Sequence, residues 1–191
     1  MRERKLREHP LLSRRVLLGA GLAIAPALAG AEDEPDPASA PPQQGDHLIF
    51  LTGPRKGMPI HVNDLKIGDA QVQAYPAAPD GTVRNGSRLN LVIVARVPTD
   101  GMGAETKTRS ADGVVAYSGV CTHQNCPVNM WSADRHAFVC SCHGSVYDPK
   151  NAATVEAGPA PRRLPALPLK SDNGMVIVAA GFTGRIGMQP G

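Results

Sequence analysis

The chain of 191 residues is long enough for one domain with extensions, and its 20 Gly and 18 Pro favour a turn-rich β domain over a helix bundle. The formal net charge of +3 is unevenly distributed along the chain. Residues 1–31 carry six Lys and Arg against two Glu, a net of +4, so the remaining residues have a net charge of −1. The sequence therefore shows no basic patch for nucleic acid.

Residues 1–31 are predicted to direct export. A charged start is followed by an uncharged run of 16 residues at 16–31. A membrane span usually needs about 20 apolar residues, whereas a signal peptide needs fewer. The stretch SRRVLL, with Arg14 and Arg15, resembles a twin-arginine export signal, although Leu17 stands where Phe is commoner. We expect a periplasmic protein, whose signal is either cleaved near ALAGA or kept as a short membrane anchor; an ordinary secretory signal is the alternative.

An acidic, proline-rich linker is predicted over residues 32–46, as an extended or disordered arm with five acidic residues and four prolines. The folded body is expected over residues 47–187. Strands are predicted at 47–51, 60–62, 89–97, 114–118, 136–140 and 175–180, and loops rich in turn signals at 74–87 and 98–113. The body has no internal repeat and no long helical pattern, so we expect an all-β, antiparallel fold.

All four cysteines lie in two short stretches, CTHQNC at residues 121–126 and CSCHGSVYD at 140–148. Each stretch also holds a histidine: His123 follows Cys121, and His143 follows Cys140. Thiolate and imidazole are metal ligands, and a hairpin between the stretches would bring them together. The pattern therefore points to a metal site.

Three kinds of site compete for these residues. Structural zinc usually takes C-x2-4-C and H-x3-5-H pairs, whereas this chain has C-x-H and C-x2-H and would leave two cysteines over. Two disulfides suit an exported protein, and four cysteines allow three pairings, but both histidines would then be unexplained. The third is an iron–sulfur cluster with two Cys on one iron and two His on the other.

The two stretches resemble the cluster-binding loops of Rieske iron–sulfur proteins, and the resemblance covers residues 112–168. It implies an antiparallel Rieske-type β-sandwich with an inserted cluster-binding subdomain, whose cluster-binding loops lie at about residues 119–148. It also implies a [2Fe–2S] cluster, whose irons would be bound by Cys121 and Cys140 on one side and by His123 and His143 on the other.

The resemblance further implies a disulfide between Cys126 and Cys142 that clamps the two loops. Ser145 would donate a hydrogen bond to a bridging sulfide and Tyr147 to the sulfur of Cys121, which raises the redox potential. Gly144 would let the backbone approach the cluster without a Cβ atom. The loop expected to cover the cluster consists of Gly158, Pro159, Ala160 and Pro161.

Asn125 stands where respiratory Rieske proteins usually carry Gly, and Asn is the best non-glycine residue for a left-handed backbone. The remaining histidines of the body, His47, His61 and His136, are interpreted as surface or strand residues without a role at the metal.

The resemblance implies one-electron transfer within a complex rather than catalysis by this chain alone. The export signal, the second cysteine pair and the Ser145 and Tyr147 hydroxyls favour a high-potential respiratory protein over an oxygenase or a ferredoxin. The preferred assignment is the small subunit of a periplasmic molybdenum oxidase similar to arsenite oxidase, beside a larger molybdenum-cofactor subunit and with a c-type cytochrome or a similar protein as acceptor. The alternatives are the iron–sulfur subunit of a cytochrome bc-type complex, which Gln124 in place of leucine disfavours, and a stand-alone carrier.

Overall fold

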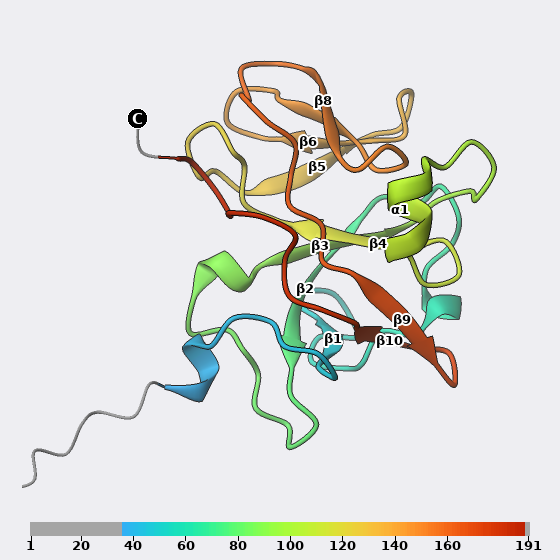
Figure 1. The fold of residues 1–191 in the computed structure, drawn as a ribbon, viewed down its shortest axis with the longest axis vertical. Helices are drawn as coiled ribbons and strands as arrows, with labels where there is room; N and C mark the ends of the chain where they lie inside the picture. Colours follow the sequence, from blue (N-terminus) through green and yellow to red (C-terminus); the bar gives the residue numbers. More distant parts are fainter. Residues whose placement is uncertain (1–35, 190–191) are drawn as a thin grey trace, which may run out of the picture. The chain divides into compact units, whose positions relative to one another are not determined.

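The computed structural model describes residues 36–189, which form two antiparallel β-sheets and one short α-helix (Figure 1). The larger sheet has the strand order β4-β3-β2-β1-β10-β9 and the smaller one β5-β6-β7-β8. The larger sheet consists of β1 (His47–Phe50), β2 (Val72–Ala77), β3 (Val92–Arg96), β4 (Val114–Ser118), β9 (Leu169–Asp172) and β10 (Met175–Val178). The smaller sheet consists of β5 (Val128–Ser132), β6 (Ala137–Cys140), β7 (Val146–Asp148) and β8 (Thr154–Ala157). The predicted all-β, antiparallel fold is confirmed.

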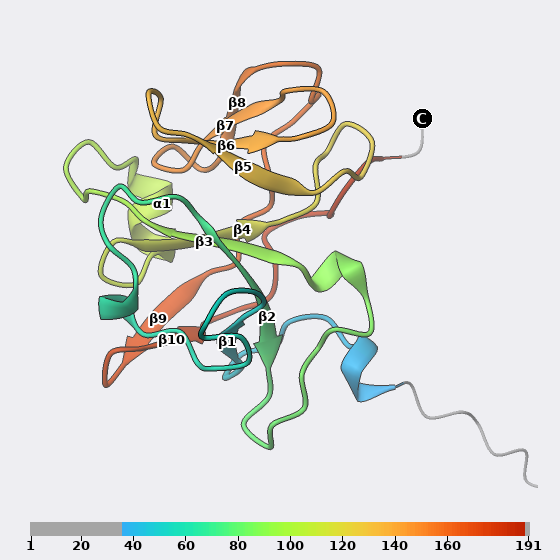
Figure 2. The same ribbon diagram turned by 180° about the vertical axis from the view of Figure 1, so that it is seen from behind.

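The smaller sheet is an insertion between β4 and β9 of the larger one. After β8 the chain returns to β4, where Ser118 donates its N–H to the carbonyl of Pro165 and Leu167 donates to the carbonyl of Ala116, both at 2.9 Å. Both views of the ribbon show the smaller sheet as a separate layer beside β3 and β4 (Figures 1 and 2). The layout therefore has the inserted subdomain that was expected.

Strand β3 joins the two hydrophobic cores because both of its faces are buried. Val92 and Val94 pack into the core of the larger sheet, whereas Ile93 and Ala95 face the core that also holds Cys121. A near-continuous apolar run is typical of a strand covered on both sides. The face of β3 that carries Ile93 therefore packs the larger sheet against the core that holds Cys121, one of the predicted metal ligands.

Several predicted elements differ in detail. The strand expected at 89–97 begins later, because residues Arg88–Asn90 form a 3-10 turn. The strand expected at 60–62 is reduced to isolated bridges, followed by the 3-10 turn Val62–Asp64. The first residues of the loop expected at 74–87 belong to the end of β2. Pro76 in this part pairs only with β1, so the N–H that proline lacks is not needed for a hydrogen bond to β3.

The loop expected at 98–113 contains helix α1 (Ala104–Arg109). Its residues are mostly good helix formers, and Glu105 pairs with Arg109 one turn later. The prediction missed α1 because six residues are too few to show a helical period.

Residues 36–46 pack against the body, so the predicted extended or disordered arm is wrong for this part of the linker. Asp36 caps a 3-10 turn at Pro37–Ser39, and the Asn90 side chain donates to the carbonyl of Ala40 at 2.7 Å. Asp46 and Arg84 form a buried ion pair with an N–O distance of 2.6 Å. Acidic composition suggested solvation, whereas this carboxylate has a buried guanidinium as its partner.

The export signal predicted at 1–31 and the start of the linker lie outside the described residues. Within residues 36–189, no helix has the length and apolar character needed to cross a membrane.

Candidate metal centre

Two loops with the same backbone hydrogen-bond pattern carry the four cysteines and the two predicted histidine ligands. Loop 1 (residues 121–126) leads from β4 to β5, and loop 2 (residues 140–145) joins β6 to β7. In each loop the N–H of the first residue donates to the carbonyl of the sixth, and the N–H of the fifth donates to the carbonyl of the first, at 2.8–3.1 Å. The two loops are thus closed in the same way, which leaves their middle residues free to face a ligand.

The fifth residue of each loop has a left-handed backbone: φ is 59° at Asn125 and 68° at Gly144. The expectation that Asn125 replaces glycine by adopting this conformation is confirmed. At Gly144 an added Cβ would meet no protein atom within 4 Å, so within the protein it is the backbone angle that favours glycine.

The four predicted iron ligands divide into an inner and an outer pair. The Cys121 and Cys140 side chains are free thiols, each 1% exposed, in the core beneath the loops. His123 is half-buried and His143 is exposed, and their ring centroids lie 4.7 Å apart at an interplanar angle of 82°. The structure therefore places the two imidazoles side by side and the two free thiols in the core beneath the same pair of loops.

Cys126 and Cys142 form a disulfide that ties loop 1 to loop 2, the pairing that the resemblance implied. The sulfurs of Cys126, Cys140 and Cys142 lie within 4.8 Å of one another. Two of these three sulfurs belong to the disulfide and offer no thiolate, so this trio is not a metal site. Cys121 and Cys140 remain as the free thiols.

The residues present fit a metal cluster. The Nδ1 atom of His123 is buried and has no hydrogen-bond partner among the described residues. Burial raises the pKa of the Cys140 thiol, so a thiolate there needs a compensating positive charge. Buried polar atoms without partners are rare and costly. An iron–sulfur cluster would supply both the partner and the charge.

Of the two predicted hydroxyl groups, that of Tyr147 contacts its expected partner and that of Ser145 has a proton without an acceptor in the described part of the chain. The phenol oxygen of Tyr147 is 3.2 Å from Sγ of Cys121, and burial raises the pKa of Tyr147, so the phenol keeps its proton and a Cys121 thiolate would accept it. Ser145 accepts the N–H of Ala160 at 3.2 Å. Its own hydroxyl proton has no acceptor among the residues that the structure describes, which leaves it available to a ligand.

The predicted covering loop, residues 158–161, is attached to both cluster loops. At Gly158 φ is 89°, and an added Cβ would lie 2.5 Å from Cα of Ser145 in loop 2, so only glycine fits. On the other side, Thr122 of loop 1 donates its hydroxyl to the carbonyl of Arg162 at 2.6 Å. The covering loop and Arg162, which directly follows it, therefore link loop 1 to loop 2 a second time, besides the disulfide.

The C-terminal tail, residues 184–189, also packs against loop 1, which the sequence did not predict. Met188 donates its N–H to Oδ1 of Asn125 at 2.6 Å, across 63 residues of sequence. At Gly187 φ is 69° and an added Cβ would lie 2.0 Å from the same oxygen. Arg162 donates to the carbonyl of Gly187. Both views show the dark red tail running beside the yellow loop 1 (Figures 1 and 2).

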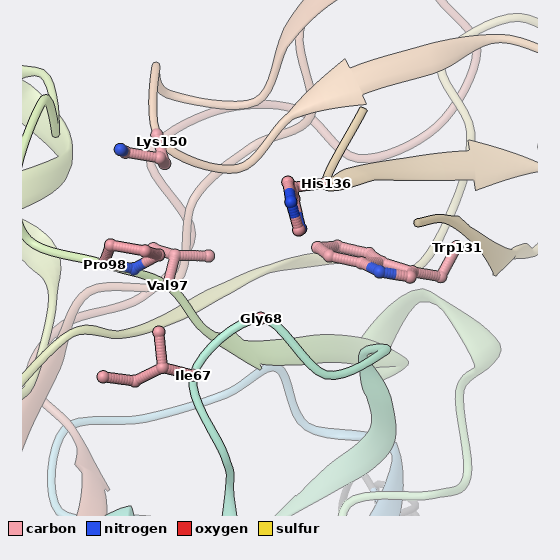
Figure 3. A pocket seen from close by; sticks show the side chains of 7 residues that line it. All are labelled: Ile67, Gly68, Val97, Pro98, Trp131, His136 and Lys150. Atoms are coloured by element: carbon pink, nitrogen blue, oxygen red, sulfur yellow. The ribbon is translucent and has the colours of Figure 1, made fainter. Parts of the chain in front are cut away.

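A separate apolar cavity of about 270 Å³ lies at the far end of the β5–β6 hairpin (Figure 3). Trp131 and His136 form one wall, Lys150 lies on the other side, and none of the predicted ligands lines it. His136 is exposed and has a φ of 49° just before β6, with its ring 6.4 Å from that of Trp131. This places His136 away from the metal centre, as was expected.

The sequence pattern described as "Rieske [2Fe-2S] domain" matches residues 73–168, half of the chain. The chain belongs to the Rieske family. Its fold, its two loops and its cofactor are therefore those of a Rieske protein, with a [2Fe–2S] cluster as the prosthetic group.

Two curated relatives are named as Rieske subunits of larger complexes. The cytochrome bc1 complex Rieske iron–sulfur subunit of Streptomyces lividans is 28% identical over 137 residues, 68% of this chain and 78% of that subunit. A putative respiratory nitrate reductase Rieske subunit of Haloferax mediterranei is 41% identical over 106 residues, 54% of this chain and 47% of that subunit. The chain thus spans less than half of the Haloferax protein.

Among solved structures, the plasma membrane Rieske protein PetC3 of the cyanobacterium Synechocystis PCC 6803 is 26% identical. The similarity covers 63% of this chain and 95% of that one, with a TM-score of 0.41.

Proposed function

We propose that this Rieske protein passes single electrons within a respiratory complex, with Cys121 and Cys140 as ligands of one iron and His123 and His143 as ligands of the other. When bound, the [2Fe–2S] cluster supplies a centre that takes up and releases one electron. The observation that carries this assignment is the pair of free, buried thiols and the pair of adjacent imidazoles, carried by two loops that a disulfide joins.

The thiols, the two hydroxyl groups and the exposed imidazole have different roles in this proposal. The thiols are buried and shielded from water, and Tyr147 and Ser145 hold protons that hydrogen-bond electron-rich sulfur and so favour the reduced state. His143 is exposed, so a partner protein approaches the centre from the imidazole side. These features support a high-potential carrier.

Ligand substitutions test the assignment. Replacing Cys140 or His143 by Ala should abolish the visible absorbance and the EPR signal of the cluster in purified, iron-replete protein. His136→Ala, at the far end of the hairpin, should retain both signals. A full cluster signal in Cys140→Ala would contradict the ligand set.

Two complexes remain as candidates. The Streptomyces relative supports a bc1-type complex, whereas Gln124 and the export signal favour a molybdenum oxidase similar to arsenite oxidase. Purification of the tagged full chain from its native membrane and periplasmic fractions separates the two. Co-purifying b-type haem indicates the first, and co-purifying molybdenum indicates the second. If neither b-type haem nor molybdenum co-purifies with the chain, the protein is a stand-alone carrier.

We also propose export to the periplasm by the twin-arginine route. The Arg14–Arg15 pair supports it, and the Cys126–Cys142 disulfide suits an oxidising compartment. Replacing both arginines by Lys should leave the cluster-loaded protein in the cytoplasm. Unchanged export of the Lys–Lys variant would contradict this route.

A further inference from the structure

Charge is unevenly distributed over the described part of the chain. Five segments include the two cluster loops or are connected to them by hydrogen bonds, and we call them the tip surface: residues 87–91, 119–126, 140–145, 158–163 and 184–189. Together they carry four Arg and no Asp or Glu, a net charge of +4. Residues 36–189 as a whole carry 14 Lys and Arg against 12 Asp and Glu, a net of +2. The described residues outside the tip surface therefore have a net charge of −2.

Backbone contacts hold two of these guanidinium groups beside loop 1. Arg88 donates to the carbonyl of Asn125 at 2.7 Å, and Arg162 donates to the carbonyl of Gly187. Gly187 itself packs against the Asn125 side chain. Arg88 and Arg162 are thus fixed on the tip surface by hydrogen bonds that neutralise no charge.

Among the described residues, Arg163 is the one arginine of the tip surface that has a carboxylate partner, Glu105 at 2.8 Å. Arg88 and Arg185 are exposed. The nearest acidic residue along the chain is Glu156, which lies two positions before the covering loop. Three positive charges, on segments that contact loop 1, therefore lack a described counter-charge.

Exposed apolar side chains lie on the same surface. Leu89 is 44% exposed beside Arg88, and Met188 is 47% exposed in the tail held by Asn125. Methionine and arginine are enriched in protein interfaces, where a ring of charge sets orientation and association rate.

We propose that the tip surface is a docking site for an electron-transfer protein with an acidic face, oriented by Arg88, Arg162 and Arg185. The inference rests on the proposed function and adds the charge of the partner. The approach of such a protein brings its redox centre to the exposed side of His143, and salt weakens the association.

The test uses one haem protein in two charge states. The full chain, reduced by one electron, is mixed in a stopped-flow instrument with a basic ferric c-type cytochrome or with the same cytochrome after succinylation of its lysines. One electron leaves the Rieske protein and one ferric haem becomes ferrous. We expect the acidic, succinylated form to react faster at low ionic strength and to slow as salt is added.

Arg88→Gln combined with Arg185→Gln should lower the rate of electron transfer to the succinylated cytochrome about 10-fold at low ionic strength, roughly 3-fold for each charge removed. The matched control, Arg135→Gln combined with Lys170→Gln, removes the same charge from exposed residues outside the tip surface and should change the rate less than 2-fold. Both variants should keep the EPR spectrum and midpoint potential of the parent.

Equal slowing by the two double variants, or faster reaction of the unmodified basic cytochrome, would overturn the docking site and leave the proposed function intact. Absence of any reducible centre in the parent protein would overturn the proposed function, and the docking site with it.

Discussion

The phenol oxygen of Tyr147 lies 3.2 Å from the sulfur of Cys121, and both side chains are buried. Reduction adds electron density to the sulfur, so this hydrogen bond strengthens in the reduced state. Tyr147→Phe removes this extra stabilisation of the reduced state, about 1 kcal/mol, which corresponds to about 40 mV for one electron. We expect the midpoint potential to fall by that amount in an EPR-monitored titration.

Tyr117→Phe is the matched control for this prediction. Tyr117 is also buried in the same core, but its hydroxyl donates to the carbonyl of Pro149 at 2.9 Å. Its loss should lower stability by about 1 kcal/mol and leave the potential unchanged. Equal potential shifts in the two variants would show that Tyr147 acts through packing alone.

The Cys126–Cys142 disulfide closes a loop between residues 16 apart in sequence. Replacing both cysteines by Ser should lower the free energy of unfolding by about 3 kcal/mol. Thermal unfolding followed by circular dichroism measures the loss. A thiol reductant should lower the midpoint of the parent toward that of the variant and have no effect on the variant. Equal stability of parent and variant in the absence of reductant would contradict a formed disulfide.

Gly158 and Gly174 both have left-handed backbones, but only Gly158 packs against another loop. Ala at Gly174 meets no atom within 4 Å, so Gly174→Ala should cost about 1 kcal/mol for the backbone alone. Gly158→Ala adds a clash with Ser145 and should cost about 3 kcal/mol, with faster loss of the cluster. Equal unfolding midpoints for the two variants would contradict the close packing of the covering loop.

Asn125 and Gly187 are predicted to be energetically coupled. Gly187→Ala places a methyl group 2.0 Å from Oδ1 of Asn125 and should release the tail. Asn125→Gly keeps the left-handed backbone but removes that oxygen, so the double variant should be more stable than the sum of the single effects predicts, by about 1 kcal/mol or more. Denaturant titration of the four proteins completes the cycle. Additive effects would mean that the tail does not pack on loop 1.

The sequence predicted the Rieske family and its cofactor because the pattern that indicates them is local. Cys121 and His123 are two residues apart, and Cys140 and His143 are three apart, so the ligands are visible as two short patterns. The strand at β3 was equally clear, since a continuous apolar run needs burial on both faces.

The contacts that hold the loops in place were missed because they join residues far apart in sequence. The Asn125 side chain meets Met188, and Asp46 meets Arg84, and neither pair belongs to a local pattern. Arg88, the adjacent Arg162 and Arg163, and Arg185 are separated from one another by long stretches of chain, so an average charge near zero concealed this group. Only the fold brings these residues together.

An EPR-monitored redox titration of the purified full chain at neutral pH tests the central claim most directly. A Rieske cluster held by two thiolates and two imidazoles, with Tyr147 and Ser145 donating to sulfur, predicts a rhombic signal that appears on one-electron reduction with a positive midpoint potential. A negative midpoint would contradict the role assigned to the two hydroxyls. Iron-replete protein without any such signal would contradict the cluster itself.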